Sequence, residues 1–499
     1  MSSKALARWV LAACLPVAMT LPALPAHSAD TAARAPDPLA GGTTTELAPG
    51  VTMTELSTGS DAGDVWTVHV YVPADPNGPI NTANTGLGTR PTAQRVADAL
   101  TAKGFAPRIE EVDLPAFADG PAQPLGWTVR VGRYTSQADA TTTYQAIRAA
   151  GFTGQVRWTG GDGGPGQLQH MYVIRVDFHA FRGTVASETG PSPAMNDMNH
   201  LSDIVPAYGA VAGINSHWFY NNAPGGLYVR DGTVLQAATQ GRGGVAITRG
   251  GRGVHVDTYR SSTTLYAGGA AVAVDGINRV PGQVWNCGGV GGDQPTEKPM
   301  HDVECTDPSE IVEFTPEWDG TPAGDGTEVV LDAHRRVVAV HTSRGTTVPA
   351  GGSTIQATGD QATWLAAHAH VGDVLRVRTR ITDSRGHRVP LTRDTTIIQT
   401  GPTLVRDGRI SIDAYGDGIV HSASDVGDEG TDQTFTYNWT VRGTPPLPSA
   451  WTTVAGCCSS PSTAGNPATA RASASTRKPG SCGAWAPSRR STSTAADPP

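Results

Sequence analysis

The stretch GINSHWFYNN at 213–222 joins polar side chains directly to aromatic ones. The amide of Asn215 and the imidazole of His217 stand just before an aromatic run that includes Phe219. Apolar walls with a few placed polar groups are typical of a small-molecule or sugar site. There Asn215 would hydrogen-bond to sugar or phosphate, and His217 would contact phosphate or transfer a proton. An Asn-rich turn between two strands would have the same composition, so both interpretations stand.

Three charged residues further along the chain would complete this chemistry. Glu317 supplies a carboxylate in FTPE, and Arg406 and Asp407 are adjacent in GPTLVRDG. Release of a sugar from a phosphodiester needs an acid, base or nucleophile, together with groups that hold phosphate and sugar. Simpler roles are a turn pairing for Glu317, a hairpin turn at 406–407 and a packing role for His217. The candidate catalytic residues are His217 and Glu317, and the candidate substrate-binding residues are Asn215, Phe219, Arg406 and Asp407.

The sequence pattern around these residues predicts the elements that position them: a larger β-rich domain of the α+β class over 167–441. Apolar residues alternate with polar ones in short runs separated by glycine, which is typical of strands and turns. A glycine-rich hinge at 160–166 precedes this domain. We expect a strand at 171–177, a helix at 195–208, a hairpin at 328–340 and a strand at 395–400.

Three segments of this domain, taken in order, resemble the phosphodiester glycosidase family. They are GIN-x-x-x-F with P-x-G at 213–226, FTPE at 314–317, and GP-x-LV-x-DG at 401–408. The type member of the family, the uncovering enzyme, removes N-acetylglucosamine from a phosphodiester on mannose. The resemblance therefore implies a hydrolase that acts on a sugar-1-phosphodiester. The chain departs from the family at Ser216 and His217, where small residues are usual, and it lacks the family's Asn-Leu-Asp-Gly-Gly-Gly-Ser loop.

A smaller domain at 62–160 is predicted from a twofold repeat. Strands are expected at 66–72, 108–112, 127–131 and 155–158. A helix should start near Pro91 and end at Gly104, and a second should begin after a cap at Ser136 and run through Ala149. The order β-α-β-β-α-β predicts a small ferredoxin-like unit.

This repeat resembles a SPOR domain. The resemblance lies in the paired Trp-x-Val-x-Val strands, the segment VGRY at 131–134, and helices that each end in Gly-Phe. SPOR domains bind peptidoglycan glycan strands stripped of their stem peptides, so peptidoglycan is the partner implied. Trp66, Trp127, Arg130 and Tyr134 would offer stacking and hydrogen bonds to sugars. A structural spacer of the same fold is the alternative, with Trp66 and Trp127 in its core.

Composition favours an exported protein that binds no nucleic acid. The chain has 499 residues, a formal net charge of −8 and only 16% charged residues. Residues 1–29 are typical of a secretory signal, with basic residues before an apolar run and small residues after it. The sequence LAAC at 11–14 also resembles a lipobox, so a lipoprotein is the alternative. We expect a secreted or wall-associated protein, outside the membrane once the signal is removed.

The remaining sequence features concern the linker and the cysteines. Residues 30–61 are typical of a linker, although 47–56 alternates like a strand and is a candidate first strand of the larger domain. Cys287 and Cys305 are the natural disulfide pair of an exported chain. No group of residues has the spacing of metal ligands, so we expect neither a metal nor another cofactor.

The tail at 442–499 is anomalous. From Ser449 onward it lacks Leu, Ile, Phe, Met, Tyr and Glu. A disordered linker is one interpretation. The other, which we favour, is a frameshift, because a shifted frame of a GC-rich gene permits a strand hairpin and an Asn-Leu-Asp-Gly-Gly-Gly-Ser loop. On that interpretation the C-terminal end of the larger domain is incomplete and the printed chain is inactive or poorly folded.

Two function hypotheses remain, together with a variant of the first. One is an exported hydrolase held on the wall by its SPOR-like module and cleaving a sugar-1-phosphodiester in a wall polymer or exopolysaccharide. The other is a non-catalytic glycan-binding protein with a truncated or degenerate catalytic domain. The variant is a phosphodiesterase, which cleaves the P–O bond instead of the glycosidic bond. The sequence leaves open the sugar, the acceptor and the oligomeric state.

Overall fold

Strands far outweigh helices in the described part of the chain, which confirms a β-rich fold of the α+β class. The computed structural model describes residues 37, 39–163, 166–190, 192, 194–216, 219–220, 223–238, 242–285, 294–295, 304–399, 403–415, 436–437 and 441–442. Its helices are α1 (Arg90–Ala102), α2 (Gln137–Ala149), α3 (Leu201–Ala207) and α4 (Gly359–His368), with 3-10 turns at Ile80–Thr82 and Thr159–Gly161. None of these helices is both long and apolar enough to cross a membrane.

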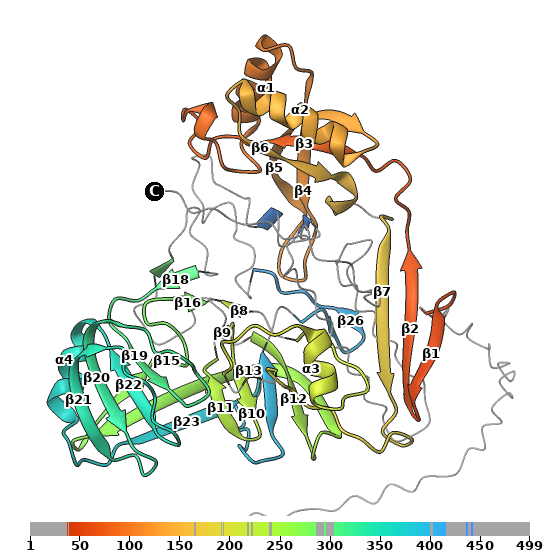
Figure 1. Ribbon diagram of the computed structural model, residues 1–499. Helices are drawn as coiled ribbons and strands as arrows, with labels where there is room; N and C mark the ends of the chain where they lie inside the picture. Colours follow the sequence, from red (N-terminus) through yellow and green to blue (C-terminus); the bar gives the residue numbers. More distant parts are fainter. Residues whose placement is uncertain are drawn as a thin grey trace, which may run out of the picture. The chain divides into compact units, whose positions relative to one another are not determined.

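The second of the two N-terminal strands pairs with a strand that lies more than a hundred residues later in the sequence. β1 (Thr43–Ala48), β2 (Val51–Thr58) and β7 (Gln169–Val176) form a three-stranded sheet in the order β1-β2-β7 (Figure 1). The ladder between β2 and β7 is antiparallel and runs from Val51 opposite Val176 to Thr58 opposite Gln169. Residues 59–168 therefore leave and rejoin this sheet at neighbouring positions. The strand predicted at 47–56 is only partly right, because 47–48 end β1, a turn follows at 49–50, and β2 begins at Val51. The sequence did not predict β1 as a separate strand.

The segment between β2 and β7 forms a four-stranded antiparallel sheet with two helices. The chain order is β3 (Trp66–Val70), α1, β4 (Pro107–Leu114), β5 (Gln123–Tyr134), α2 and β6 (Gly154–Trp158), and the sheet order is β4-β5-β3-β6. We call this unit the inserted module. Thr89 caps α1 and Ser136 caps α2, each accepting a hydrogen bond from a backbone N–H of the first turn. Valines of β3 and β5 pack with Leu100 and Ile147 of the helices.

A seven-stranded sheet follows, in the order β11-β10-β24-β12-β13-β14 with β23 paired to β13. The strands are β10 (Tyr228–Arg230), β11 (Thr233–Gln236), β12 (Arg242–Thr248), β13 (Gly253–Ala267), β14 (Ala270–Val274), β23 (Arg376–Thr382) and β24 (Thr396–Gln399). Both faces of its centre are buried, because Val245 and Ile398 join one apolar cluster while Ala246 and Ile397 join another. Such strands appear as continuous apolar runs in the sequence.

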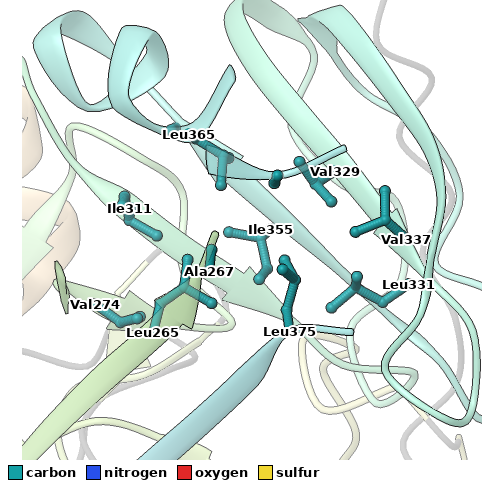
Figure 2. Close-up of a cluster of buried hydrophobic side chains, with 12 residues drawn as sticks. Leu265, Ala267, Val274, Ile311, Val329, Leu331, Val337, Ile355, Leu365 and Leu375 are labelled. Atoms are coloured by element: carbon teal, nitrogen blue, oxygen red, sulfur yellow. The ribbon is translucent and has the colours of Figure 1, made fainter. Parts of the chain in front are cut away.

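A five-stranded sheet shares an apolar core with the seven-stranded sheet. β15 (Gly276–Ile277), β19 (Ile311–Phe314), β22 (Ser353–Ala357), β20 (Gly324–Leu331) and β21 (Val337–Arg344) lie in that order. Leu365 of α4 packs with Ile355 and with Leu265 of β13 in one apolar cluster (Figure 2). Side chains of β19 alternate between this cluster and that of the seven-stranded sheet, so β19 ties the two together.

The remaining strands are short. β8 (Phe219–Tyr220) pairs with β9 (Ala223–Pro224), and β25 (Val405–Arg406) pairs with β26 (Arg409–Ile410). β16 (Val284–Trp285), β18 (Glu304–Thr306) and β17 (Gln294–Pro295) form a small sheet in that order.

The helix predicted over 195–208 was too long, since only Leu201–Ala207 is helical. Before α3 the chain is fixed by tertiary contacts instead. The N–H of Met195 donates to the carbonyl of Glu317 at 2.7 Å, and the amide of Asn196 exchanges two hydrogen bonds with the backbone of Asp319.

Candidate functional site

Four strand ends meet at one edge of the seven-stranded sheet, which we call the motif edge. There β10 and β12 begin while β11 and β24 end, because β10 runs antiparallel to β11 and β24, and β12 antiparallel to β24. Three large polar side chains are buried at this edge: Gln236, Arg242 and Gln399 are 5%, 2% and 1% exposed. Buried polar groups need hydrogen-bond partners, so they fix the geometry around them.

Gln399 ties three strands together at the motif edge. Its side-chain oxygen accepts from the N–H of Leu227 at 2.9 Å. Its side-chain nitrogen donates to the carbonyls of Arg242 at 3.1 Å and Tyr259 at 3.0 Å. Its own N–H donates to the carbonyl of Leu227 at 2.8 Å. The chain that leaves β24 toward 401–408 is thereby held against the chain that enters β10 from 213–226.

Gly226 makes room for this tie. A Cβ at Gly226 would lie 3.1 Å from the side-chain oxygen of Gln399, which is tighter than ordinary contact. Glycine lets a backbone approach a neighbour this closely. The P-x-G pattern at 224–226 thus has a local structural reason.

Asn278 connects the third motif to the same edge. Its side-chain nitrogen donates to the carbonyl of Leu235 in β11 at 2.9 Å and to the hydroxyl of Thr315 at 2.8 Å. Its side-chain oxygen accepts from the N–H of Thr315 at 2.8 Å. Asn278 is fully buried and has a φ of 52°, a conformation that asparagine tolerates better than most residues. Segment 314–317 is therefore anchored beside the end of β11.

Apolar side chains next to the motif segments also pack together in one cluster. Tyr228, Phe314 and Ile398 belong to one buried cluster, and the ring of Phe314 meets that of Trp318 edge-on at 5.8 Å. The structure therefore brings the backbones around the three sequence motifs together.

The predicted catalytic and substrate-binding side chains are less closely grouped. Asn215 is exposed on the segment between α3 and β8, and Glu317 is half-buried in the turn after β19. His217 and the side chain of Phe219 lie outside the described residues. Within the described part of the chain, no hydrogen bond or ion pair joins Asn215 to Glu317 or to Arg406.

Arg406 and Asp407 lie at a hairpin turn, as the simpler interpretation predicts. Both are exposed, in the hairpin that joins β25 to β26. Asp407 has a φ of 50° and Gly408 a φ of 76°, and positive values at both central residues are typical of a tight hairpin turn.

The four predicted glycan-binding residues do not share one surface of the inserted module. Trp127 is half-buried and packs on the apolar cluster beneath the helices. The Tyr134 hydroxyl is 2.7 Å from that of Thr143 in α2. Trp66 packs on Trp158 with ring centroids 5.4 Å apart. Arg130 stands between Val129 and Val131, which pack with the helices, so it points to the face of the sheet that the helices leave uncovered.

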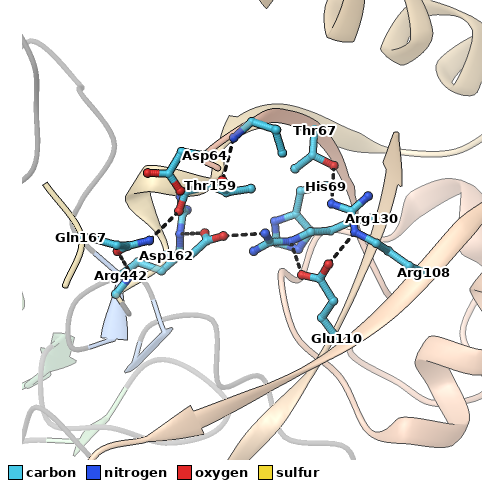
Figure 3. Close-up of polar contacts among 12 residues, drawn as sticks. Asp64, Thr67, His69, Arg108, Glu110, Arg130, Thr159, Asp162, Gln167 and Arg442 are labelled. Atoms are coloured by element: carbon cyan, nitrogen blue, oxygen red, sulfur yellow. Dashed lines mark hydrogen bonds and ion pairs between the residues drawn. The ribbon is translucent and has the colours of Figure 1, made fainter. Parts of the chain in front are cut away.

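That uncovered face, which we call the polar face, carries a network of arginines and carboxylates (Figure 3). Arg130 contacts Asp162 at 2.5 Å and Glu110 at 3.3 Å. Arg442 reaches the other oxygen of Asp162 at 3.2 Å, and Arg108 pairs with Glu110 at 2.5 Å. Burial opposes a charge on Arg130, but Asp162 and Glu110 outweigh it and raise its pKa.

A second cluster of ionisable groups includes Glu310, which follows Cys305 closely in the sequence. Glu310 is fully buried and forms a two-point ion pair with Arg279, and it also accepts from the N–H of Gly282 at 2.5 Å. Burial raises the pKa of nearby Asp275 to about 7. No group of three or more metal-ligating side chains occurs in the part of the chain that the structure describes. Cys305 is disulfide-bonded, and Cys287 lies outside the described residues.

Sequence reasoning missed Gln399, Asn278 and Arg242. One signal was available for Gln399, a lone amide at the end of an apolar strand directly before the Gly-Pro motif. Asn278 follows an Asp-Gly turn and resembles any turn residue until its partners are known.

Comparison with known structures gives a strong structural similarity. The fold matches the crystal structure of a "putative exported protein" from Burkholderia pseudomallei, with 27% identity, 80% of each chain covered and a TM-score of 0.68. A hypothetical protein from Synechocystis matches at 13% identity and a TM-score of 0.36, over 77% of this chain and 59% of that one. No family model and no curated protein matches the chain.

Proposed function

We propose that this protein is an exported, cell-wall-associated hydrolase that cleaves a sugar-1-phosphodiester, similar to that of N-acetylglucosamine, in a wall polymer or exopolysaccharide. The observation that carries the proposal is the convergence at the motif edge. Gln399 and Asn278 hold together three segments that carry the ordered phosphodiester glycosidase motifs. A composite active site requires such convergence, because reacting groups must be held within a few tenths of an ångström.

The chemistry available at this edge suits a phosphorylated sugar. Arg242 brings a guanidinium group there, and guanidinium groups bind phosphate through paired hydrogen bonds. Asn215 and His217 are our candidates for sugar and phosphate contacts on the segment that leads into β10, and Glu317 is the candidate carboxylate beyond Thr315. The contacts and groups proposed here require no cofactor.

Export is supported by two independent observations. Residues 1–29 resemble a secretory signal, and the similar Burkholderia protein is described as exported. The inserted module is the proposed wall anchor, and its element order supports the SPOR-like assignment. The main alternative, a non-catalytic glycan-binding protein, is favoured by the anomalous tail, which lacks the glycine-rich loop that the phosphodiester glycosidases use.

The first experiment is to resequence the gene from the codon of Asn438 past that of Pro499. A one-base correction that opens Asn-Leu-Asp-Gly-Gly-Gly-Ser would give a complete chain. That chain should release N-acetylglucosamine from its 1-(methyl phosphate) ester in ¹⁸O-water, with the label in the sugar. Label in the phosphate product would establish phosphodiesterase chemistry instead. A frame confirmed as printed, together with no hydrolysis, would favour the binding protein.

A further inference from the structure

Tyr437 lies on the polar face of the inserted module, in the middle of a group of basic side chains. Its phenol oxygen accepts a hydrogen bond from Nη2 of Arg130 at 3.1 Å. The guanidinium carbons of Arg442 and Arg157 lie 5.5 and 6.0 Å from its ring centroid. The imidazole of His69 meets the ring edge-on at 6.4 Å. One neutral phenol thus meets three guanidinium groups, one at its oxygen and two over its ring, and Tyr437 is only 1% exposed.

Positive charge on this face exceeds the negative charge available to balance it. Glu110 pairs with Arg108 and Arg130, and Asp162 pairs with Arg130 and Arg442. Two carboxylates therefore serve three arginines. No ion pair in the described part of the chain joins a fourth arginine, Arg157, to a carboxylate.

In the described part of the chain the hydrogen bonds of Arg157 go to a neutral group, and the charge of Asp162 acts on it only without a direct ion pair. With the Gln155 amide oriented to satisfy its neighbours, the oxygen of that amide accepts from both Nε and Nη2 of Arg157. Arg157 is 6% exposed, and burial lowers its pKa. A buried cation without a carboxylate partner is costly, and an anionic ligand would relieve that cost.

Unused hydrogen-bonding atoms accompany the excess charge. Nη1 of Arg157, Nη1 of Arg442 and Nδ1 of His69 are buried without a hydrogen-bond partner. His69 is fully buried, and burial together with Arg157 and Arg130 lowers its pKa well below the usual value, so the ring is neutral at neutral pH. The unpaired guanidinium atoms are donors, and the ligand that would satisfy them must be rich in acceptors.

We infer that the polar face of the inserted module is a binding site for the phosphodiester groups of an anionic wall polymer, and that Tyr437 occupies this site in competition with the polymer. The choice of phosphodiester over another anion rests on the proposed function. A phosphodiester oxygen in the place of the phenol would accept from Arg130, and a second would be available to the free donors of Arg157 and Arg442. A neutral glycan would bring hydroxyls but leave the excess charge unbalanced.

The test measures binding of the full chain to poly(glycerol phosphate), with uncharged dextran and carboxylate-bearing polygalacturonate as comparison polymers. Binding should be specific to poly(glycerol phosphate) and should weaken as salt is raised. Arg157→Gln should weaken it about tenfold, the size expected for one charge-assisted hydrogen bond. Tyr437→Ala should strengthen it, because the competing phenol is removed. Arg148→Gln, which removes an exposed charge from α2, should leave it unchanged.

The outcomes separate the inference from the proposed function. Equal binding of polygalacturonate would overturn the phosphodiester assignment, and equal binding of dextran would overturn an anion site altogether. Unchanged affinity in a folded Arg157→Gln variant, or weaker binding by Tyr437→Ala, would overturn the placement at this face. Specific binding of poly(glycerol phosphate) by a complete chain that cleaves no sugar-1-phosphodiester would sink the proposed function and uphold this inference.

Discussion

Gln399 and Leu227 are joined by two hydrogen bonds, although 172 residues separate them in the sequence. In one bond the N–H of Leu227 donates to the side chain of Gln399, and in the other the backbone N–H of Gln399 donates to the carbonyl of Leu227. The pair fixes the register between the segment that follows Gly226 and the segment that precedes the Gly-Pro motif. The proposed active site depends on this register.

Replacing Gln399 by leucine should destabilise the fold. The substitution leaves the buried N–H of Leu227 and the carbonyls of Arg242 and Tyr259 short of partners, at a cost of about 2–3 kcal/mol. A urea titration should show an earlier midpoint. Gln145→Leu makes the same chemical change at an exposed position of α2 and should have little effect. Equal shifts in the two variants would count against the tie.

A side chain at Gly120 should displace the ring of Tyr415, because its added Cβ would fall 2.0 Å from that ring. Gly120→Ala should push that ring aside and break the hydrogen bond from Gln123 to the Tyr415 hydroxyl, which measures 2.9 Å. Limited proteolysis with chymotrypsin should then cut after Tyr415 faster than in the parent chain. Ala122→Val adds carbon at a nearby exposed position, and its digestion should match the parent.

Arg279 and Glu310 should show strong coupling in a double-mutant cycle. Arg279→Met leaves a fully buried carboxylate without its partner, which should cost about 3–5 kcal/mol. Adding Glu310→Gln should recover much of that loss, because the unpaired charge is then gone. Thermal denaturation of the parent and the three variants gives the coupling energy directly. Additive losses would mean that the ion pair does not behave as a unit.

Asp275 should make stability fall with rising pH. Its folded pKa of about 7 lies above its unfolded value of 3.8, mainly because of burial, with a further rise from Glu310 and Asp307 and opposition from the N–H of Ile311 and from Arg279. Between these two pH values the unfolded chain releases a proton that the folded chain keeps, so the free energy of unfolding decreases and then levels off.

Asp275→Asn removes this ionisation. Its melting temperature should exceed that of the parent near about pH 8, and the two should coincide near about pH 4. Asp394→Asn, at an exposed turn, serves as the matched control. Its melting temperature should change between these two pH values by as much as that of the parent. A parent-like pH profile in Asp275→Asn would assign the titration to another group.

The inserted module shows how far local sequence signals reach. The predicted helix with Pro91 near its start is α1, and the predicted cap Ser136 precedes α2 as expected. Caps, glycine stops and apolar periodicity are local, so they are visible in the sequence alone. The strand expected at 395–400 is likewise β24, and the hairpin expected at 328–340 is formed by β20 and β21.

Long-range contacts determine the features that the sequence alone did not predict. The position of Tyr437 on the polar face depends on Arg130, which lies 307 residues earlier. The late start of α3 depends on Glu317 and Asp319, which no periodicity near 195 reveals. For the candidate site, sequence found the motif segments but not the buried amides of Gln399 and Asn278. Their importance comes from partners on other strands.

The pairing of Thr58 with Gln169 makes residues 59–168 a removable cassette. Because the β2–β7 ladder continues to these two residues, a short turn joining them would turn the strands into an ordinary hairpin. Excision would also strip away Leu114 and Phe117, which cover Ile412 and Ala414. The shortened chain would thus expose an apolar patch immediately after the β25–β26 hairpin, and its solubility would report how strongly the two parts have come to depend on each other.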